Sequence, residues 1–173
     1  EFGPDWEHLG EHVCVHTNDT HPAMCGPELM RILVDEKGVG FDEAYRIAKE
    51  TISFTNHTVM PEALEKLPIN TFRNLLPRLY MFIDEVDRRY RESLSNHLSP
   101  NEGNWTDVLS KTAILWDGQV RMANLSIIFS HSINGVSALH TQILKDSVFH
   151  EFYEMMPHRF NNKTNGVTHR RFL

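Results

Sequence analysis

The side chains of this 173-residue chain that are best suited to chemistry lie in four polar segments at the ends of expected strands and helices. The segments are residues 16–21, 55–65, 131–135 and 162–168, and each combines Asn or His with Thr, Ser or Gly. Amide and imidazole groups both donate and accept hydrogen bonds, as sugar hydroxyls do. Loops at strand ends are where α/β proteins build their sites. The four segments together therefore indicate a site for a neutral, hydroxyl-rich ligand.

Metal chemistry is a weaker interpretation, although the chain contains 11 histidines. His16 and His21 are five positions apart around a strand-to-helix turn, with Asp19 between them. That spacing does not place two imidazoles on one helix face, as a zinc-dependent protease requires. For His57 alone, a structural role is favoured over a ligand-binding one, and only the recurrence of Asn/His loops shifts that balance. We expect no metal site.

The sequence contains no motif for a phosphate-binding loop or for a serine hydrolase. Neither a GxGxxG nor a GxxxxGK[ST] pattern occurs, and no GxSxG segment supplies a nucleophile. Lys163 and the pair Arg170–Arg171 could attract an anion, but a solvated basic pair near a chain end is the ordinary explanation.

Composition narrows the class of protein further. The formal net charge is −6, which repels a nucleic-acid backbone, so no nucleic-acid partner is expected. Hydrophobic residues make up 40% and charged residues 23%, a balance typical of one globular domain. The two cysteines suggest reduced thiols, and neither a secretory signal nor a membrane-spanning stretch is visible. The sequence therefore predicts a cytoplasmic protein without a membrane partner. Because it begins at Glu1 and not at Met, we expect a piece of a longer chain.

The elements that position the first two polar segments follow from hydrophobic spacing. A β-prone run at residues 13–16 predicts a strand, and the following loop leads into a helix that ends near Gly38. A second helix is predicted from Asp42 to about Phe54, and a loop is predicted at residues 55–62 before Pro61.

The second half of the chain is predicted to be mainly helical. Apolar residues at helical spacing predict the longest helix from Leu75 over about twenty residues, interrupted near its start by Pro77. Residues 96–107 read as a surface loop, the apolar run 125–130 as a buried strand, and residues 130–136 as a loop. Two further helices are expected at residues 137–145 and 148–155. Strands followed by helices indicate an α/β fold, with only two good strand candidates.

The four polar segments also resemble a known family. TNDTHP at residues 17–22, TNHTVMPEALE at 55–65, SHSINGV at 130–136 and NKTNGVT at 162–168 are similar to the α-glucan phosphorylases, the glycogen, starch and maltodextrin enzymes. The motifs occur in the family's order and cover nearly the whole chain. The resemblance implies that residues 1–173 are the C-terminal part of the family's N-terminal domain. It implies a helix-rich part of a Rossmann-like half in a two-domain glycosyltransferase-type fold.

The resemblance also implies an activity. Enzymes of this family release α-glucose 1-phosphate from α-1,4-glucan ends by reversible phosphorolysis, with pyridoxal phosphate as cofactor. The expected partners are therefore an α-1,4-glucan and phosphate, and the parent enzyme is expected to be a homodimer.

Residue roles carry over position by position from the motifs. His57 would be the catalytic residue: its imidazole would bind the glucose 6-hydroxyl and its main-chain carbonyl would face the anomeric carbon. Asn165 would hold the same region of the sugar, and Val136 would form an apolar wall. The pocket beside the anomeric side would be lined by Asp19, His21, Ala63 and Glu65.

The family's cofactor lysine and its phosphate-binding residues lie in segments absent from this sequence. We therefore expect no covalent pyridoxal anchor here and an inactive isolated chain. His169 and Phe172 also stand where the family usually has proline and tryptophan, which leaves the geometry of that linker open.

Two alternatives to a phosphorylase remain open at this point. One is a non-catalytic carbohydrate-binding or interaction module that shares these loops. The other is a metal-dependent hydrolase, which the histidine spacing disfavours.

Overall fold

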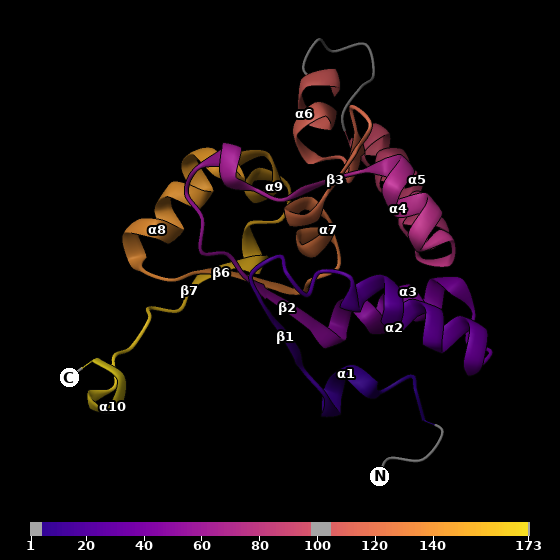
Figure 1. Cartoon of the computed structure of the whole chain (residues 1–173), viewed down its shortest axis with the longest axis horizontal. Helices are drawn as coiled ribbons and strands as arrows, with labels where there is room; N and C mark the ends of the chain where they lie inside the picture. The colour runs from indigo at the N-terminus through magenta and orange to yellow at the C-terminus, as the bar shows by residue number, and fades with distance from the viewer. Residues whose placement is uncertain (1–4, 98–104, 173) are drawn as a thin grey trace.

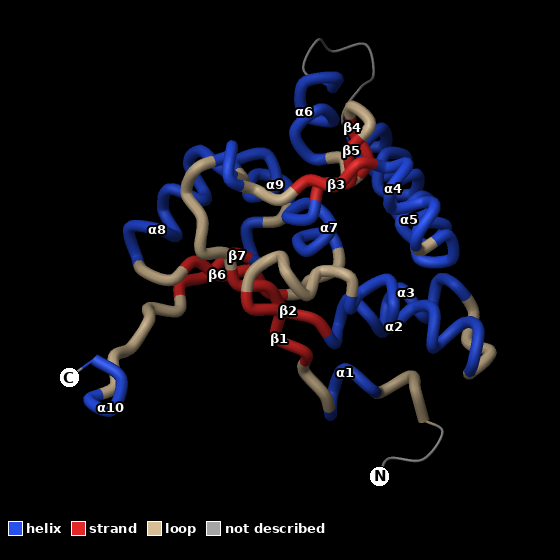
Figure 2. Tube along the Cα trace, viewed as in Figure 1, coloured by secondary structure: helices blue, strands red, loops and turns tan. Residues whose placement is uncertain are grey.

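The computed structural model describes residues 5–97 and 105–172 of the chain. Its centre is a four-stranded parallel sheet in the order β1-β2-β6-β7. The strands are β1 (Val15–Asn18), β2 (Ile52–Thr55), β6 (Ser132–Gly135) and β7 (Phe160–Asn162). Figure 2 shows these strands in the middle of the molecule, with helices on either side. The expected α/β class is confirmed.

Helices connect each strand to the next one in the sheet. Between β1 and β2 lie α2 (Cys25–Arg31), the π-helical η1 (Ile32–Glu36) and α3 (Phe41–Thr51). Between β6 and β7 lie α8 (Ala138–Ile143), the π-helical η3 (Leu144–Val148), α9 (His150–Met155) and the short 3₁₀ helix η4 (Pro157–Arg159). Crossovers of this kind are what parallel strands require.

The long connection between β2 and β6 forms a second layer. It contains the 3₁₀ turn η2 (Pro61–Ala63), α4 (Ile69–Leu75), α5 (Pro77–His97), α6 (Trp105–Thr112) and α7 (Met122–Ile128). It also forms a small antiparallel sheet of β3 (Lys66–Pro68), β5 (Gln119–Arg121) and β4 (Leu115–Trp116). Asp117 and Gly118 both have positive φ, as the tight turn between β4 and β5 requires. Figure 1 shows this layer on one side of the parallel sheet.

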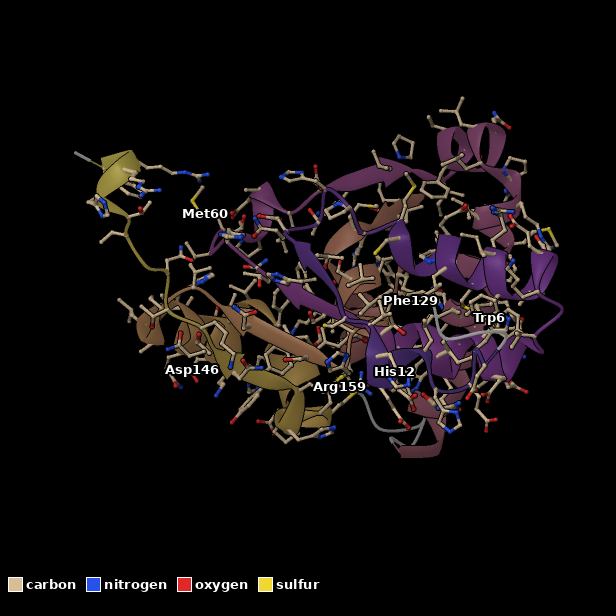
Figure 3. The ribbon with its side chains drawn as sticks, turned by 90° about the horizontal axis from the view of Figure 1, so that it is seen from below. Trp6, His12, Met60, Phe129, Asp146 and Arg159 are labelled. Carbon is tan, nitrogen blue, oxygen red and sulfur yellow. The ribbon has the colours of Figure 1, made fainter. Side chains whose placement is uncertain are left out.

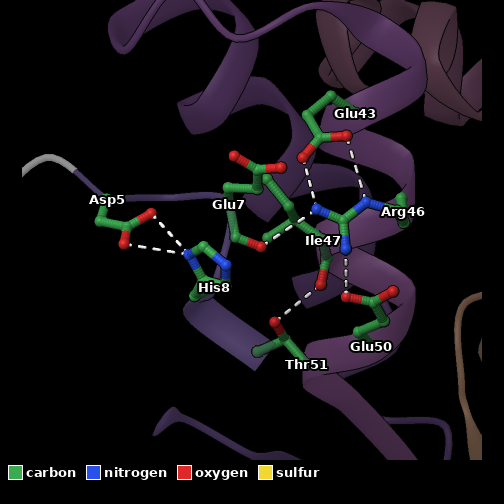
Figure 4. Close-up of polar contacts among 8 residues, drawn as sticks. All are labelled: Asp5, Glu7, His8, Glu43, Arg46, Ile47, Glu50 and Thr51. Carbon is green, nitrogen blue, oxygen red and sulfur yellow. Dashed lines mark hydrogen bonds and ion pairs between the residues drawn. The ribbon is translucent and has the colours of Figure 1, made fainter. Parts of the chain in front are cut away.

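The two ends of the described chain differ in how they are held. The segment before β1 contains α1 (Leu9–His12) and contacts α3, where Arg46 donates to the Glu7 carbonyl at 3.0 Å. Arg46 also pairs with Glu43 and Glu50 on its own helix (Figure 4). At the other end, α10 (His169–Phe172) is exposed and stands apart from the main body (Figure 1).

The core lies between the parallel sheet and its covering helices. Its largest fully buried side chains are Phe54, Phe129, Phe152, Met30, Leu33, Ile47, Ile83, Ile114, Leu125, Ile127, Ile133 and Leu144. The set includes one residue each from β2 and β6, and most of the others come from helices. Helix packing onto the sheet therefore buries most of the apolar surface that stabilises the fold.

Three predicted elements were wrong. The helix expected to reach Phe54 ends at Thr51, and the residues after it form β2. The run at 125–130, expected to be a strand, mostly belongs to α7, whose residues are all buried. The loop expected at 130–136 contains β6. A short apolar run cannot be assigned to a helix or a strand by periodicity, because both can be buried on all sides.

The strand count and two boundaries also need correction. Four parallel strands replace the two expected: only the first expected strand exists, as β1, the second is helical, and β2, β6 and β7 were missed. Pro77 begins α5 and does not interrupt it, since the first turn of a helix tolerates proline. Of the surface loop expected at 96–107, residues 96 and 97 end α5 and residues 105–107 begin α6, while 98–104 lie outside the described residues.

Candidate functional site

The four polar segments lie at one edge of the parallel sheet. They follow or include the ends of β1, β2, β6 and β7, namely Asn18, Thr55, Gly135 and Asn162. Because the four strands are parallel, their carboxyl ends point to the same edge. The register confirms this, since Asn18 pairs with Thr55, Thr55 with Asn134, and Gly135 with Asn162. The sheet thus brings together segments separated by more than a hundred residues.

The ring of His57 is oriented by the neighbouring strand. Its Nε2 lies 2.6 Å from Oδ1 of Asn18, the last residue of β1. An amide oxygen only accepts hydrogen bonds, so Nε2 carries the hydrogen and donates it. Nδ1 of the neutral ring is then left as an acceptor. His57 is exposed, so this acceptor is accessible to a ligand hydroxyl.

Backbone bonds fix the chain on both sides of His57. Asn56 is fully buried and its N–H donates to the Asn134 carbonyl at 3.0 Å. The side-chain oxygen of Asn56 accepts from the Thr58 N–H at 3.0 Å, forming a tight local turn. Among the residues that the structure describes, no hydrogen bond occupies the His57 carbonyl oxygen. The position of that oxygen is therefore fixed by the neighbouring hydrogen bonds, and the oxygen remains free to face a positive charge.

His140 locks the same loop from α8. Its Nδ1 accepts from the Val136 N–H at 3.0 Å, so its Nε2 carries the hydrogen and donates to the Thr58 carbonyl at 3.2 Å. The side chain is 7% exposed. Ser137 caps α8 by accepting from the His140 N–H at 3.1 Å. One buried imidazole thus joins the loop after β6 to the loop after β2.

A chain of side-chain hydrogen bonds runs across the ends of three strands. Thr55 Oγ1 donates to Asn134 Oδ1 at 2.7 Å, and His16 Nε2 lies 2.5 Å from the same hydroxyl. Since Thr55 uses its hydrogen on Asn134, its lone pair accepts from His16. These bonds hold β1, β2 and β6 in register directly beneath the loops.

Asp19 turns the chain sharply at the end of β1. Its φ is +80°, in the left-handed region that Asp and Asn tolerate better than other non-glycine residues. Its N–H donates to the Thr55 carbonyl at 2.9 Å and its side chain accepts from the Thr20 N–H at 2.7 Å. This conformation costs about 1 kcal/mol. Strain of this kind concentrates at functional sites.

Glu65 connects the loops after β1 and β2. Its carboxylate accepts from the Thr20 hydroxyl and lies 3.3 Å from Nδ1 of His21. Its own carbonyl accepts from the Met122 N–H at 3.1 Å, which ties it to the start of α7. The structure therefore brings together two of the predicted site residues, His21 and Glu65.

Val136 and Asn165 are joined through their backbones. The Asn165 N–H donates to the Val136 carbonyl at 2.9 Å, and the Lys163 N–H donates to the Gly135 carbonyl at 3.1 Å. Val136 is half-buried and Asn165 is exposed. The loop after β7 is thereby held beside the loop after β6, with the Asn165 side chain open to a ligand.

Glycine is required at position 135. A β-carbon there would lie 2.6 Å from Oγ1 of Thr141 and 2.9 Å from its Cα, closer than side chains approach. The first turns of α8 can therefore pack against β6 only because residue 135 has no side chain.

Ala63 lies farther along the loop after β2. It ends the 3₁₀ turn η2 and is exposed, and its N–H donates to the Met60 carbonyl at 3.0 Å. None of the bonds described above joins it to the other predicted site residues. Its proximity to Glu65 follows only from their being two positions apart in the sequence.

Asn18, Asn134 and His140 support the site but were not predicted. Asn18 and Asn134 lie within the polar segments, and their positions next to Asp19 and Gly135 were a usable signal. For His140, the only signal was its place three residues after Ser137, a helix-capping position, and that spacing does not reveal the bond to Thr58.

Metal and thiol chemistry gain no support at this edge. Within residues 5–97 and 105–172, no group of three or more His, Cys, Asp or Glu side chains is arranged to hold a metal ion. Burial raises the pKa of the Cys25 thiol, which keeps it protonated and a poor nucleophile. No helix in the described residues is both long and apolar enough to cross a membrane.

Comparisons with known proteins agree with the motif resemblance. The family model described as carbohydrate phosphorylase matches residues 1–173. Glycogen phosphorylase of Bacillus subtilis is 47% identical over 165 residues, which is 95% of this chain. The human brain form is 44% identical over 171 residues, and the cytosolic alpha-glucan phosphorylase 2 of Arabidopsis thaliana is 42% identical over 172 residues, each covering 97% of this chain. The chain spans about 20% of the length of these relatives.

Proposed function

This chain belongs to the carbohydrate phosphorylase family, and from that premise we propose that it forms one wall of a glucose subsite. In the full-length protein, the site would serve phosphorolysis of α-1,4-glucan ends to glucose 1-phosphate. The observation that carries the proposal is the way His57 is positioned: Asn18 orients its ring, and hydrogen bonds hold the backbone on both sides of it. Nothing in the comparisons favours a non-catalytic carbohydrate-binding module.

The geometry of His57 suits both tasks that the proposal gives it. Nδ1 is the acceptor of the neutral ring and can accept from the glucose 6-hydroxyl, because Nε2 donates to Asn18. The carbonyl oxygen would face the anomeric carbon, where positive charge develops as the glycosidic bond breaks. A dipole fixed in advance stabilises such a charge more in the transition state than in the ground state.

The other residues would shape the pocket around the sugar. Asn165 offers both a donor and an acceptor to the hydroxyls, and Val136 offers an apolar surface beside it. Asp19, His21, Ala63 and Glu65 would line the pocket at the anomeric side. The Glu65 carboxylate accepts from Thr20 and contacts His21, so its role is to position these side chains and to favour positive charge.

Pyridoxal phosphate enters the proposal only for the full-length protein, where its phosphate group would assist proton transfer. The loops after the four parallel strands carry one lysine among the described residues, Lys163, whose side chain is exposed. A covalent pyridoxal site needs a lysine seated in a cavity, so these residues do not fit the cofactor. We assign no step of this chain's chemistry to it, and we propose that the chain alone is inactive.

The remaining properties of the full-length protein are proposals on the same basis. We propose that it uses an α-1,4-glucan and phosphate, that it is a homodimer and that it works in the cytoplasm. We also propose that residues 1–173 are the C-terminal part of its N-terminal domain.

A kinetic comparison tests the role of His57. In the full-length protein, His57→Ala should lower kcat for glucose 1-phosphate formation from maltooligosaccharide and phosphate by about 10²-fold, with little change in KM. His150→Ala, which removes an exposed imidazole at the start of α9 and outside the four polar segments, is the matched control and should leave turnover unchanged. A raised KM with unchanged kcat would show that His57 binds the ground state and the transition state equally.

Three measurements on the chain itself test the remaining claims. With added pyridoxal phosphate, the chain alone should form no glucose 1-phosphate, and formation of product would contradict the proposed division of the site. In calorimetry it should bind maltooligosaccharide very weakly, since the opposite wall is missing. Tight binding would favour the carbohydrate-binding module, and stoichiometric zinc in elemental analysis would favour a metal-dependent hydrolase.

A further inference from the structure

A cavity lies between α3, α5 and the segment that leads into β7. Its volume is about 750 Å³, within the range of pockets that take small organic molecules. Its walls include Tyr45 and Lys49 of α3, Tyr90 of α5, Ile128 of α7 and Arg159 of η4.

This cavity lies at the opposite edge of the sheet from the proposed glucose subsite. Lys49 is shortly before β2, Ile128 shortly before β6 and Arg159 directly before β7. The cavity is therefore at the amino ends of these parallel strands. Figure 3 shows Arg159 well separated from Met60, which lies on the loop after β2. A ligand in this cavity would not compete with the sugar.

Two cations in the cavity lack a carboxylate partner. No ion pair joins Lys49 or Arg159 to an acidic residue in the described part of the chain, whereas Arg89 on the same wall pairs with Glu85 and Asp42. Burial lowers the pKa of both Lys49 and Arg159, and the charge of Arg159 lowers that of Lys49 further. The two positive charges therefore repel each other, and Glu154, the one carboxylate that lines the cavity, forms no ion pair with either of them among the described residues.

Contacts within the fold stabilise these cations only in part. Arg159 donates one N–H to the Ser130 carbonyl at 3.2 Å, which leaves other guanidinium donors unused. The Lys49 ammonium lies 5.5 Å from the centroid of the Tyr45 ring, a cation–π distance. Neither contact neutralises a charge. An anion placed between Lys49 and Arg159 would do so and would use their free donors.

Much of the remaining cavity wall is apolar and aromatic, although polar side chains also line it, namely Arg89, Ser93, Glu154 and His158. Tyr45 packs edge-on against Phe129, with centroids 5.5 Å apart and an interplanar angle of 81°, which fixes its ring. Leu94, Ile128, Met155 and the Tyr90 ring complete the apolar wall. A small inorganic ion would leave this surface unfilled, whereas a planar ring would bury it.

We propose that this cavity binds a small organic anion that carries an aromatic ring. The anionic group would lie between Lys49 and Arg159, and the ring would pack among Tyr45, Tyr90 and Met155. The site is separate from the glucose subsite, so it does not depend on the proposed function.

Naphthoate tests the proposal because it combines a planar ring with one carboxylate. Calorimetry on the full-length protein should detect its binding, and the neutral isostere naphthalenemethanol should bind about tenfold more weakly. Arg159→Gln and Lys49→Gln should each weaken naphthoate binding about tenfold, while Arg159→Lys retains most of it. Lys145→Gln is the matched control, because Lys145 also lies over a tyrosine, Tyr153, but outside the cavity.

Three results would overturn the proposal. Naphthoate that does not bind would show that the cavity is closed to ligands in the full-length protein. Equal binding of the neutral isostere, or equal loss with Lys145→Gln, would show that Lys49 and Arg159 recognise no charge. Each variant is first checked by its melting temperature, and Lys49→Gln decides the matter if Arg159→Gln does not fold. Formation of glucose 1-phosphate is a separate assay, so this site and the proposed function can fail independently.

Discussion

Oδ1 of Asn18 lies 2.6 Å from Nε2 of His57, so the last residue of one strand sets the tautomer of a ring on the loop after the next strand. The two residues are 39 positions apart in the sequence. They meet because β1 and β2 are paired in parallel, with Asn18 opposite Thr55. The acceptor at Nδ1 of His57 therefore depends on the sheet as well as on the loop.

Removing the side chain of Asn18 should slow the reaction without unfolding the protein. In the full-length protein, Asn18→Ala leaves the His57 ring free to rotate and to change tautomer, so kcat for phosphorolysis should fall about tenfold, the equivalent of one hydrogen bond. Asn70→Ala, an exposed asparagine on α4, is the control. Equal turnover of the two variants would show that Asn18 does not position His57.

Loss of the His140 imidazole should destabilise the fold. His140→Ala leaves the Val136 N–H and the Thr58 carbonyl without their partner, at a cost of about 1–3 kcal/mol. Urea unfolding measures the change in free energy of unfolding. His150→Ala removes only an exposed bond to the Lys145 carbonyl and should cost less. If the two variants unfold at the same urea concentration, the bridge between the loops contributes nothing to stability.

A methyl group at position 135 should be poorly tolerated. In Gly135→Ala the new β-carbon would meet the Thr141 backbone, so β6 or α8 must shift, at a cost of about 1–3 kcal/mol. Gly40→Ala is a matched substitution, because a β-carbon at Gly40 meets nothing within 4 Å. Thermal unfolding should show a large drop in Tm for the first variant and a small change for the second. A similar Tm for both would contradict the close packing of α8 on β6.

Tyr45 should make the fold sensitive to alkali. Burial raises the pKa of its hydroxyl from 10.0 to about 12, opposed in part by the charges of Arg159 and Arg89. Because the folded pKa is the higher one, the stabilisation is complete below pH 10 and is lost as the pH rises to about 12. Tyr45→Phe should therefore retain more of its stability between these pH values.

Chemical unfolding at a series of alkaline pH values measures this effect. Tyr80→Phe removes a hydroxyl at the exposed face of α5 and serves as the control. A parallel loss of stability in the protein and in Tyr45→Phe would show that this hydroxyl does not ionise on unfolding.

The sequence showed the polar segments more clearly than it showed the strands. The polar segments were visible because Asn or His recurs with Thr, Ser or Gly in four separate segments, and the family resemblance gave each predicted site residue a role. The strands Ile52–Thr55, Ser132–Gly135 and Phe160–Asn162 were missed because each has only three or four residues, too few to show a period. The helix Met122–Ile128 was missed for a related reason, since a helix buried on all sides has no polar face.

The sequence by itself determined the chemistry available: amides and imidazoles in four segments, an acidic net charge and the family to which they belong. Tertiary structure decided which of these groups meet. Parallel pairing brings Asn18 to His57, and helix packing brings His140 to Thr58 and leaves Lys49 and Arg159 in one cavity without a carboxylate partner among the described residues. The physical reason is that hydrogen bonds and charges act over a few ångströms. Only the folded backbone sets distances of that order between residues far apart in the chain.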